Sequence, residues 1–134
     1  MSPVLLCGCL AAPAEEAEHH TPAHRPVDFP AAVTRLDALH AELLDAKTAR
    51  PPGTIDAMTE LSDIVRWLPE LAADSDLDRT AWDRVAATTR LFEADVARVR
   101  AAPQERQSAE YANAAALLEQ HLRALRELSE IYRT

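Results

Sequence analysis

The sequence contains very little of the residues that build phosphate loops, sheets and disulfide frameworks. Its 134 residues include two glycines, two cysteines, and two each of tryptophan, tyrosine and phenylalanine. Two glycines cannot form a glycine-rich loop that cradles phosphate, and no Gly-x-Ser-x-Gly motif of a serine hydrolase is present. Sparse aromatic and β-branched residues disfavour a sheet. We therefore expect an all-α protein that is not an enzyme and has no catalytic residues.

The cysteines, the lack of long apolar runs and the charge exclude further classes of protein. Cys7 and Cys9 are separated by one residue, so no disulfide can cross-link distant parts of the fold. No run approaches the roughly 20 apolar residues that a membrane-spanning helix requires. The formal net charge is −8, and the basic residues are interspersed with acids. This pattern disfavours a nucleic-acid partner and a basic helix lying on a membrane surface.

What is abundant favours helices, since alanine, leucine, glutamate and arginine dominate the chain. Apolar residues recur at spacings of three and four in four stretches, about 31–47, 54–73, 78–102 and 104–132. Helices of this kind bury their stripes best as antiparallel neighbours. Residues 30–134 therefore predict an up-down-up-down antiparallel four-helix bundle. A three-helix core crossed by one short helix, and a homodimer through the helix faces, are the alternatives.

Helix-breaking and capping residues predict where the helices begin and end. The segment 50–53, which holds two prolines and a glycine, predicts a tight connection followed by Thr54 as the N-cap of the second helix. Asp78 is the expected N-cap of the third helix. Pro69 removes a backbone hydrogen bond inside the second stretch, so we expect the helix to kink or to restart after Trp67.

The N-terminal part of the chain has the composition of a linker. Residues 10–29 contain prolines, three histidines and a cluster of glutamates, with almost nothing apolar to bury. The prolines favour an extended backbone, so this Pro/His/Glu-rich segment is expected to act as a semi-stiff spacer ahead of the bundle. Residues 1–9 are expected to be a separate, truncated signal-like segment.

The segment 6–9, with the sequence LCGC, resembles the lipobox of bacterial lipoproteins. The resemblance implies a lipid on Cys9, and hence a membrane-anchored protein in an extracytoplasmic space. A secretory signal needs a basic start and an apolar run of about 7–15 residues. No lysine or arginine precedes Arg25, so this interpretation needs a start codon upstream of Met1. The alternatives are a cytoplasmic N-terminus with two ordinary thiols and a Cys-x-Cys metal or redox site.

Histidines are the candidate metal ligands. His19, His20 and His24 lie within six positions and are flanked by glutamates, and imidazole with carboxylate can bind Zn or Cu. A linker loses conformational entropy when it wraps a metal, so tight binding needs another ligand from the bundle. His121 is the candidate for that fourth ligand. The competing interpretation is a solvated linker that happens to contain histidine.

Two histidines, His40 and His121, lie on or beside the apolar stripes of their helices. Histidines on neighbouring helices can bind haem or a metal in a bundle core. If the 50–53 connection and Pro103 lie at one end, however, these two are about 16 Å apart along the bundle at about 1.5 Å per residue. We therefore expect two separate core-flanking histidines whose rings have hydrogen-bond partners.

Redox cofactors are poorly matched by the remaining residues. No Cys-x-x-Cys-His haem motif is present. A di-iron bundle requires inward glutamates and a Glu-x-x-His pair on each of two helices, and the nearest match is a single Asp-x-x-His at 37–40. The acidic residues of the helices are expected on solvated faces, among them Glu60, Asp63, Glu93 and Asp95. A cytochrome-like electron-transfer bundle is therefore the weakest alternative, and haem is not expected.

The sequence thus predicts a surface-tethered, extracytoplasmic helical-bundle binding module that takes a transition metal through its N-terminal histidines. The alternative is a purely structural or protein–protein interaction domain with no metal. Trp67 and Trp82 flank the turn between the second and third helices. They are expected to be core residues at that end of the bundle, with anchoring of a protein partner as the other interpretation.

Overall fold

The computed structural model describes residues 21–45, 47 and 49–133, and this part of the chain contains helices and no strand. The helices are α2 (Phe29–Leu44), α3 (Ala57–Ala73), α4 (Arg79–Arg100), the short 3-10 helix η2 (Gln104–Arg106) and α5 (Gln107–Arg133). No helix in these residues is long and apolar enough to cross a membrane.

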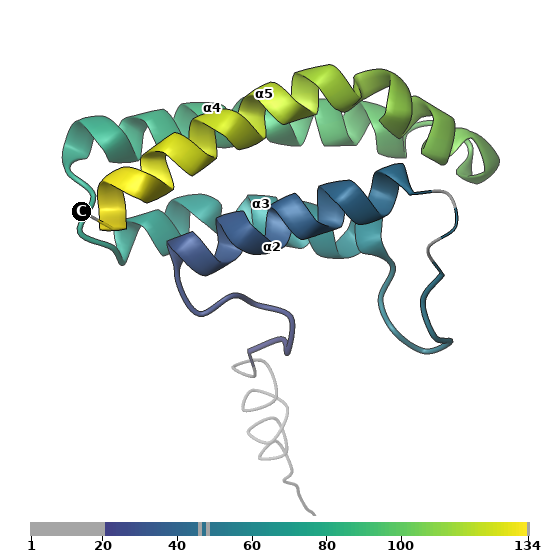
Figure 1. Cartoon of the computed structure of the whole chain (residues 1–134), viewed down its shortest axis with the longest axis horizontal. Helices are drawn as coiled ribbons and strands as arrows, with labels where there is room; N and C mark the ends of the chain where they lie inside the picture. The colour runs from purple at the N-terminus through teal and green to yellow at the C-terminus, as the bar shows by residue number, and fades with distance from the viewer. Residues whose placement is uncertain (1–20, 46, 48, 134) are drawn as a thin grey trace, which may run out of the picture.

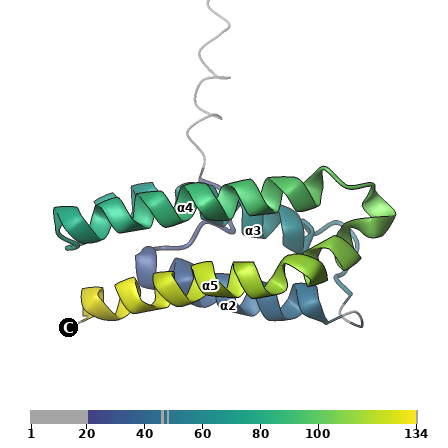
Figure 2. The same ribbon diagram turned by 90° about the horizontal axis from the view of Figure 1, so that it is seen from above.

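The four long helices form an antiparallel bundle. Each packs against its neighbour in the sequence, and α5 packs back against α2. Figures 1 and 2 show that the α2–α3 and α4–α5 connections lie at one end and the α3–α4 connection at the other. The predicted all-α, up-down-up-down four-helix bundle is confirmed.

The predicted apolar stripes face the centre of the bundle. The largest side chains without exposed surface come from all four helices: Phe29, Leu36, Leu39, Leu61, Ile64, Leu68, Phe92, Tyr111, Leu118, Leu122, Leu125 and Leu128. Burying one such side chain contributes roughly 1.5–3 kcal/mol, so this core dominates the stability of the fold. Leu44 and Leu117 lie outside this core and are 45 % and 40 % exposed.

Three helices begin at an aspartate whose side chain accepts a backbone hydrogen bond from the third residue after it. The distances from Asp28, Asp56 and Asp78 to these nitrogens are 2.9, 2.8 and 2.8 Å. Such a cap contributes about 1 kcal/mol. The prediction for Asp78 is confirmed, whereas that for Thr54 is wrong. The Thr54 hydroxyl instead donates to the Pro51 carbonyl at 2.8 Å, and α3 begins only after Asp56.

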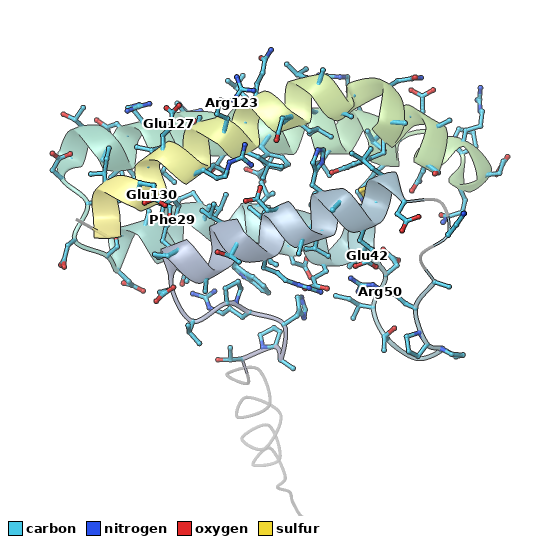
Figure 3. The ribbon with its side chains drawn as sticks, in the orientation of Figure 1. Phe29, Glu42, Arg50, Arg123, Glu127 and Glu130 are labelled. Atoms are coloured by element: carbon cyan, nitrogen blue, oxygen red, sulfur yellow. The ribbon has the colours of Figure 1, made fainter. Side chains whose placement is uncertain are left out.

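The connection between α2 and α3 is longer than the tight turn expected at 50–53. Helix α2 ends at Leu44 and α3 begins at Ala57, so residues 45–56 join them. Gly53 has a φ of 88°, a left-handed conformation that a side chain would strain. Arg50 holds the connection to α2, because its Nε donates to Oε2 of Glu42 at 2.6 Å. Figure 3 shows these two side chains next to each other.

Pro69 does not interrupt α3, which continues to Ala73. The predicted restart after Trp67 is therefore wrong. The Pro69 carbonyl accepts a hydrogen bond from Nε1 of Trp82 at 3.1 Å, which links the last turns of α3 to the start of α4. Both tryptophans are partly buried against the core, as expected for this end of the bundle.

Candidate functional site

The segment that leads into α2 meets α3 through a turn. The Arg25 N–H donates to the Pro22 carbonyl at 3.1 Å, which closes the turn and brings His24 and Arg25 to the surface of α3. Residues 21–28 were expected to be part of a linker. They lie instead along the outer side of the bundle, beside α2 and α3 (Figure 1).

His24 forms the central contact of this junction. Its Nε2 lies 2.8 Å from Oδ2 of Asp63, and the two side chains are 23 % and 20 % exposed. Asp63 was expected on a solvated face of its helix. The structure therefore joins one predicted metal ligand to a carboxylate that is 39 positions away in the sequence.

Trp67 supports the junction from one turn further along α3. The ring of His24 lies 5.2 Å from the ring of Trp67, and the guanidinium of Arg25 lies 5.3 Å from the same ring. Arg25 also reaches Oε2 of Glu70 at 3.5 Å. The spacing of Asp63, Trp67 and Glu70 by four and three places them on one face of α3. The junction thus consists of one face of α3 and the two adjacent side chains that contact it.

The second oxygen of Asp63 is held by its own helix. Oδ1 accepts a hydrogen bond from Nη2 of Arg66 at 2.6 Å, an ion pair three positions apart. Arg66 is 60 % exposed, so solvent screens this pair strongly. With Oδ1 bonded to Arg66, Oδ2 is the oxygen of Asp63 that faces His24.

The His24–Asp63 pair supplies two ligand types that Zn and Cu accept. In a tetrahedral zinc site, ligand atoms lie about 2.0–2.2 Å from the metal, so the 2.8 Å pair would have to open by roughly 0.5 Å. Within residues 21–45, 47 and 49–133, no group of three or more histidine, cysteine, aspartate or glutamate side chains could hold a metal. The predicted ligands His19 and His20 lie outside the described residues.

His121, the predicted fourth ligand, lies in the core between α4 and α5. Its Nε2 is 2.6 Å from Oδ2 of Asp95, and both side chains are less than a tenth exposed. The ring lies 5.6 Å from that of Phe92. Arg98 donates to the other oxygen of Asp95, so both oxygens of the carboxylate have hydrogen-bond partners. Because a carboxylate only accepts, Nε2 of His121 is the donor in this pair, and burial lowers the pKa of His121.

His40 makes a separate pair with Tyr111 between α2 and α5. Its Nδ1 lies 2.8 Å from the Tyr111 hydroxyl, and Tyr111 has no exposed surface. Burial lowers the pKa of His40 and raises the pKa of Tyr111. Tyr111 precedes His121 by ten positions in α5, about 15 Å at about 1.5 Å per residue. His40 and His121 therefore do not converge, and each ring has a partner, as predicted.

A network of two glutamates and two arginines ties the α2–α3 connection to both helices. Arg35 donates from Nε and Nη2 to Glu60 at 2.6 and 2.9 Å. Arg50 lies 3.1 Å from Glu60 and makes two bonds of 2.6 and 3.0 Å to Glu42. The hydrogen bond from Arg35 lowers the pKa of Glu60, and that from Arg50 lowers the pKa of Glu42.

Glu60 and Asp95 were predicted on solvated faces, and both predictions are wrong. They are 5 % and 6 % exposed. Asp95 follows the buried Phe92 by three positions and precedes the buried Val99 by four, and Glu60 stands in the same relation to Ala57 and Ile64. An acidic residue in this position lies on the inner flank of a stripe, which is the signal that would have identified both.

Comparison with known proteins gives no relative from which a function can be inferred. No protein-family model matches the chain, and no curated protein or solved structure matches it. The bundle and its His–Asp pairs are therefore the basis for a functional proposal.

Proposed function

We propose that this protein is a surface-tethered, extracytoplasmic helical module that binds Zn or Cu at the junction between its N-terminal segment and α3. The observation that supports this function is the 2.8 Å contact between His24 and Asp63. Histidines on a free linker must be ordered by the metal, at a cost in conformational entropy. Here His24 is already fixed beside Asp63 in the folded protein. The metal therefore has to order fewer residues when it binds.

The proposed ligands are Nε2 of His24, Oδ2 of Asp63, and the imidazoles of His19 and His20. His20 precedes His24 by four positions in the sequence. Only a short length of chain therefore separates the remaining proposed ligands from the His24–Asp63 pair. Four nitrogen and oxygen ligands are a common set for Zn. His121 is not included, because its Nε2 is bonded to Asp95 within the core.

The tether is supported by the lipobox-like segment 6–9, with Cys9 as the proposed lipid attachment site. The chain passes from there through the histidines to the turn that contacts α3. A metal held at His24 and Asp63 would join the tether to the bundle and fix the direction in which the bundle leaves the membrane. This is the feature that distinguishes the proposal from a metal bound anywhere on a free linker.

The test is calorimetric titration of the full 134-residue chain with Zn²⁺ and Cu²⁺. We expect one metal per chain with submicromolar affinity, weakened at least about tenfold by His24→Ala and by Asp63→Asn. Asp83→Asn is the matched control, because Asp83 is an exposed aspartate on α4 that pairs with Arg79. Its affinity should equal that of the unmodified chain.

Two results would overturn the metal site. Affinity unchanged by Asp63→Asn would mean that the histidines bind as an unfolded peptide does, without the bundle. No stoichiometric binding at all would leave a tethered protein-interaction domain as the function. The triple variant His19→Ala, His20→Ala, His24→Ala gives the background from the rest of the chain.

A further inference from the structure

A cavity of about 380 Å³ opens at the end of the bundle where the α2–α3 and α4–α5 connections lie. Each of the four long helices contributes to its lining, for example through Leu43, Met58, Arg100 and Tyr111. Figure 1 shows the α2–α3 connection extending away from the α4–α5 hinge at this end. None of the residues of the His24–Asp63 junction takes part, so the cavity is independent of the proposed metal site.

The lining of the cavity combines apolar and polar side chains. Leu43 and Met58, which are partly buried against the core, and Tyr111 supply apolar surface. The Tyr111 hydroxyl is occupied by His40. Gln107 is a polar member of the lining, and its amide nitrogen donates to the Ala102 and Arg100 carbonyls at 3.0 and 3.2 Å. A ligand with an apolar body and a polar end fits this distribution.

Two opposite charges line the cavity without forming an ion pair. The Asp56 carboxylate caps α3, and the hydrogen bond from Thr59 lowers the pKa of Asp56, with the charge of Arg100 adding to that effect. The Asp56 carboxylate is therefore ionised and interacts electrostatically with Arg100. In the described part of the chain, the Arg100 guanidinium makes no hydrogen bond or ion pair, and its charge acts on Asp56 in the same lining, so a ligand that pairs with one of these charges must also satisfy the other.

We propose that this cavity binds a small zwitterion with an apolar side chain, in the class of an α-amino acid the size of leucine. The carboxylate of the ligand pairs with Arg100, its ammonium with Asp56, and its side chain packs against Met58 and Leu43. A simple organic anion would meet repulsion from Asp56, and a simple amine would meet repulsion from Arg100. A molecule that carries both charges satisfies both side chains at once.

The test uses the full chain and three related probes. L-leucine carries both charges, N-acetyl-L-leucine lacks the ammonium, and L-leucinamide lacks the carboxylate. We expect saturable binding of leucine below about 1 mM, observed by calorimetry or by shifts of amide resonances from the lining residues. Each of the two other probes should bind at least about tenfold more weakly.

Variants identify which charge each probe uses. Asp56→Asn keeps the helix cap, because asparagine caps as well as aspartate, and should weaken leucine binding about tenfold with only a small decrease in melting temperature from the lost charge. Arg100→Gln should weaken it to a similar extent. The binding of N-acetyl-leucine should not fall in Asp56→Asn, and that of leucinamide should not fall in Arg100→Gln. Arg90→Gln, an exposed arginine of α4 outside the cavity, is the control.

Three outcomes would overturn the proposal. They are no saturable leucine binding, equal binding of leucine and N-acetyl-leucine, and variant effects no larger than that of Arg90→Gln. Equal binding of the first two probes would indicate a site for organic anions in general. Because the readout involves no metal, failure here leaves the His24–Asp63 proposal untouched, and the converse also holds.

Discussion

Nε2 of His121 on α5 lies 2.6 Å from Oδ2 of Asp95 on α4, in a part of the core that is less than a tenth exposed. A buried hydrogen-bonding group is tolerated when its partner is in place and is costly when the partner is removed. This pair is therefore a polar element that holds α4 and α5 in one register.

Replacing Asp95 with alanine should destabilise the protein by about 1–3 kcal/mol, because the buried His121 loses its acceptor. Urea unfolding followed by circular dichroism measures this change. Glu93→Ala, an exposed position on the same helix, should change the free energy of unfolding by less than about 0.5 kcal/mol. The double variant Asp95→Leu, His121→Leu should lose much less than Asp95→Ala does, since no polar group is left unpaired. Equal losses in the two α4 single variants would contradict this interpretation.

Stability should fall as the pH is lowered below about 6.5. Burial lowers the pKa values of His40 and His121 from the ordinary value of 6.5, so the unfolded chain binds protons first. The two neutral imidazoles make their full contribution to the free energy of unfolding above pH 6.5. That contribution is lost as the pH falls from 6.5 through the lowered pKa values of the folded state. The midpoint of thermal unfolding between pH 7.5 and pH 5 measures this loss. In His40→Gln, whose amide does not titrate, the decline over this range should be shallower, and an unchanged decline would exclude His40 as a contributor.

Glu60→Ala should destabilise the bundle by about 1–3 kcal/mol, because the buried carboxylate binds both Arg35 and Arg50. The loss of stability should be smaller than for breaking a fully buried ion pair. Arg35 is 43 % exposed, so solvent compensates for part of the lost interaction. Hydrogen exchange should also become faster in the connection 45–56, which Arg50 holds in place. The control is Glu70→Ala, an exposed glutamate 3.5 Å from Arg25, with an expected change below about 0.5 kcal/mol. A loss of the same size in both variants would argue against the network.

Cys9 should carry a lipid when the gene is expressed with its upstream DNA in a bacterium. Metabolic labelling with a fatty-acid analogue, followed by membrane fractionation, should give a labelled, membrane-associated protein. Cys9→Ala should lose both the label and the membrane association, whereas Cys7→Ala should keep them. Absence of label in all three proteins would favour the cytoplasmic alternative.

Parts of the site could be anticipated from the sequence and parts could not. His24 was predicted to be a metal ligand because imidazole has a distinctive chemistry wherever it stands in the chain. Its partner Asp63 is 39 positions away, on a helix with several other acids, and nothing local distinguishes Asp63 from them. Pro69 shows the opposite error, since a local rule predicted that the helix would kink or restart, and α3 runs through Pro69 without a restart.

By itself, the sequence determined the four helices, their inward faces and the cap at Asp78. These follow from spacing and from bonds between residues three or four apart, which depend only on the local chain. Only the tertiary structure decided which residues Asp95 and Glu60 bind, namely His121 and Arg35, and that His24 contacts α3. Both kinds of contact join residues that are distant in the sequence, so they exist only once the helices have packed against one another.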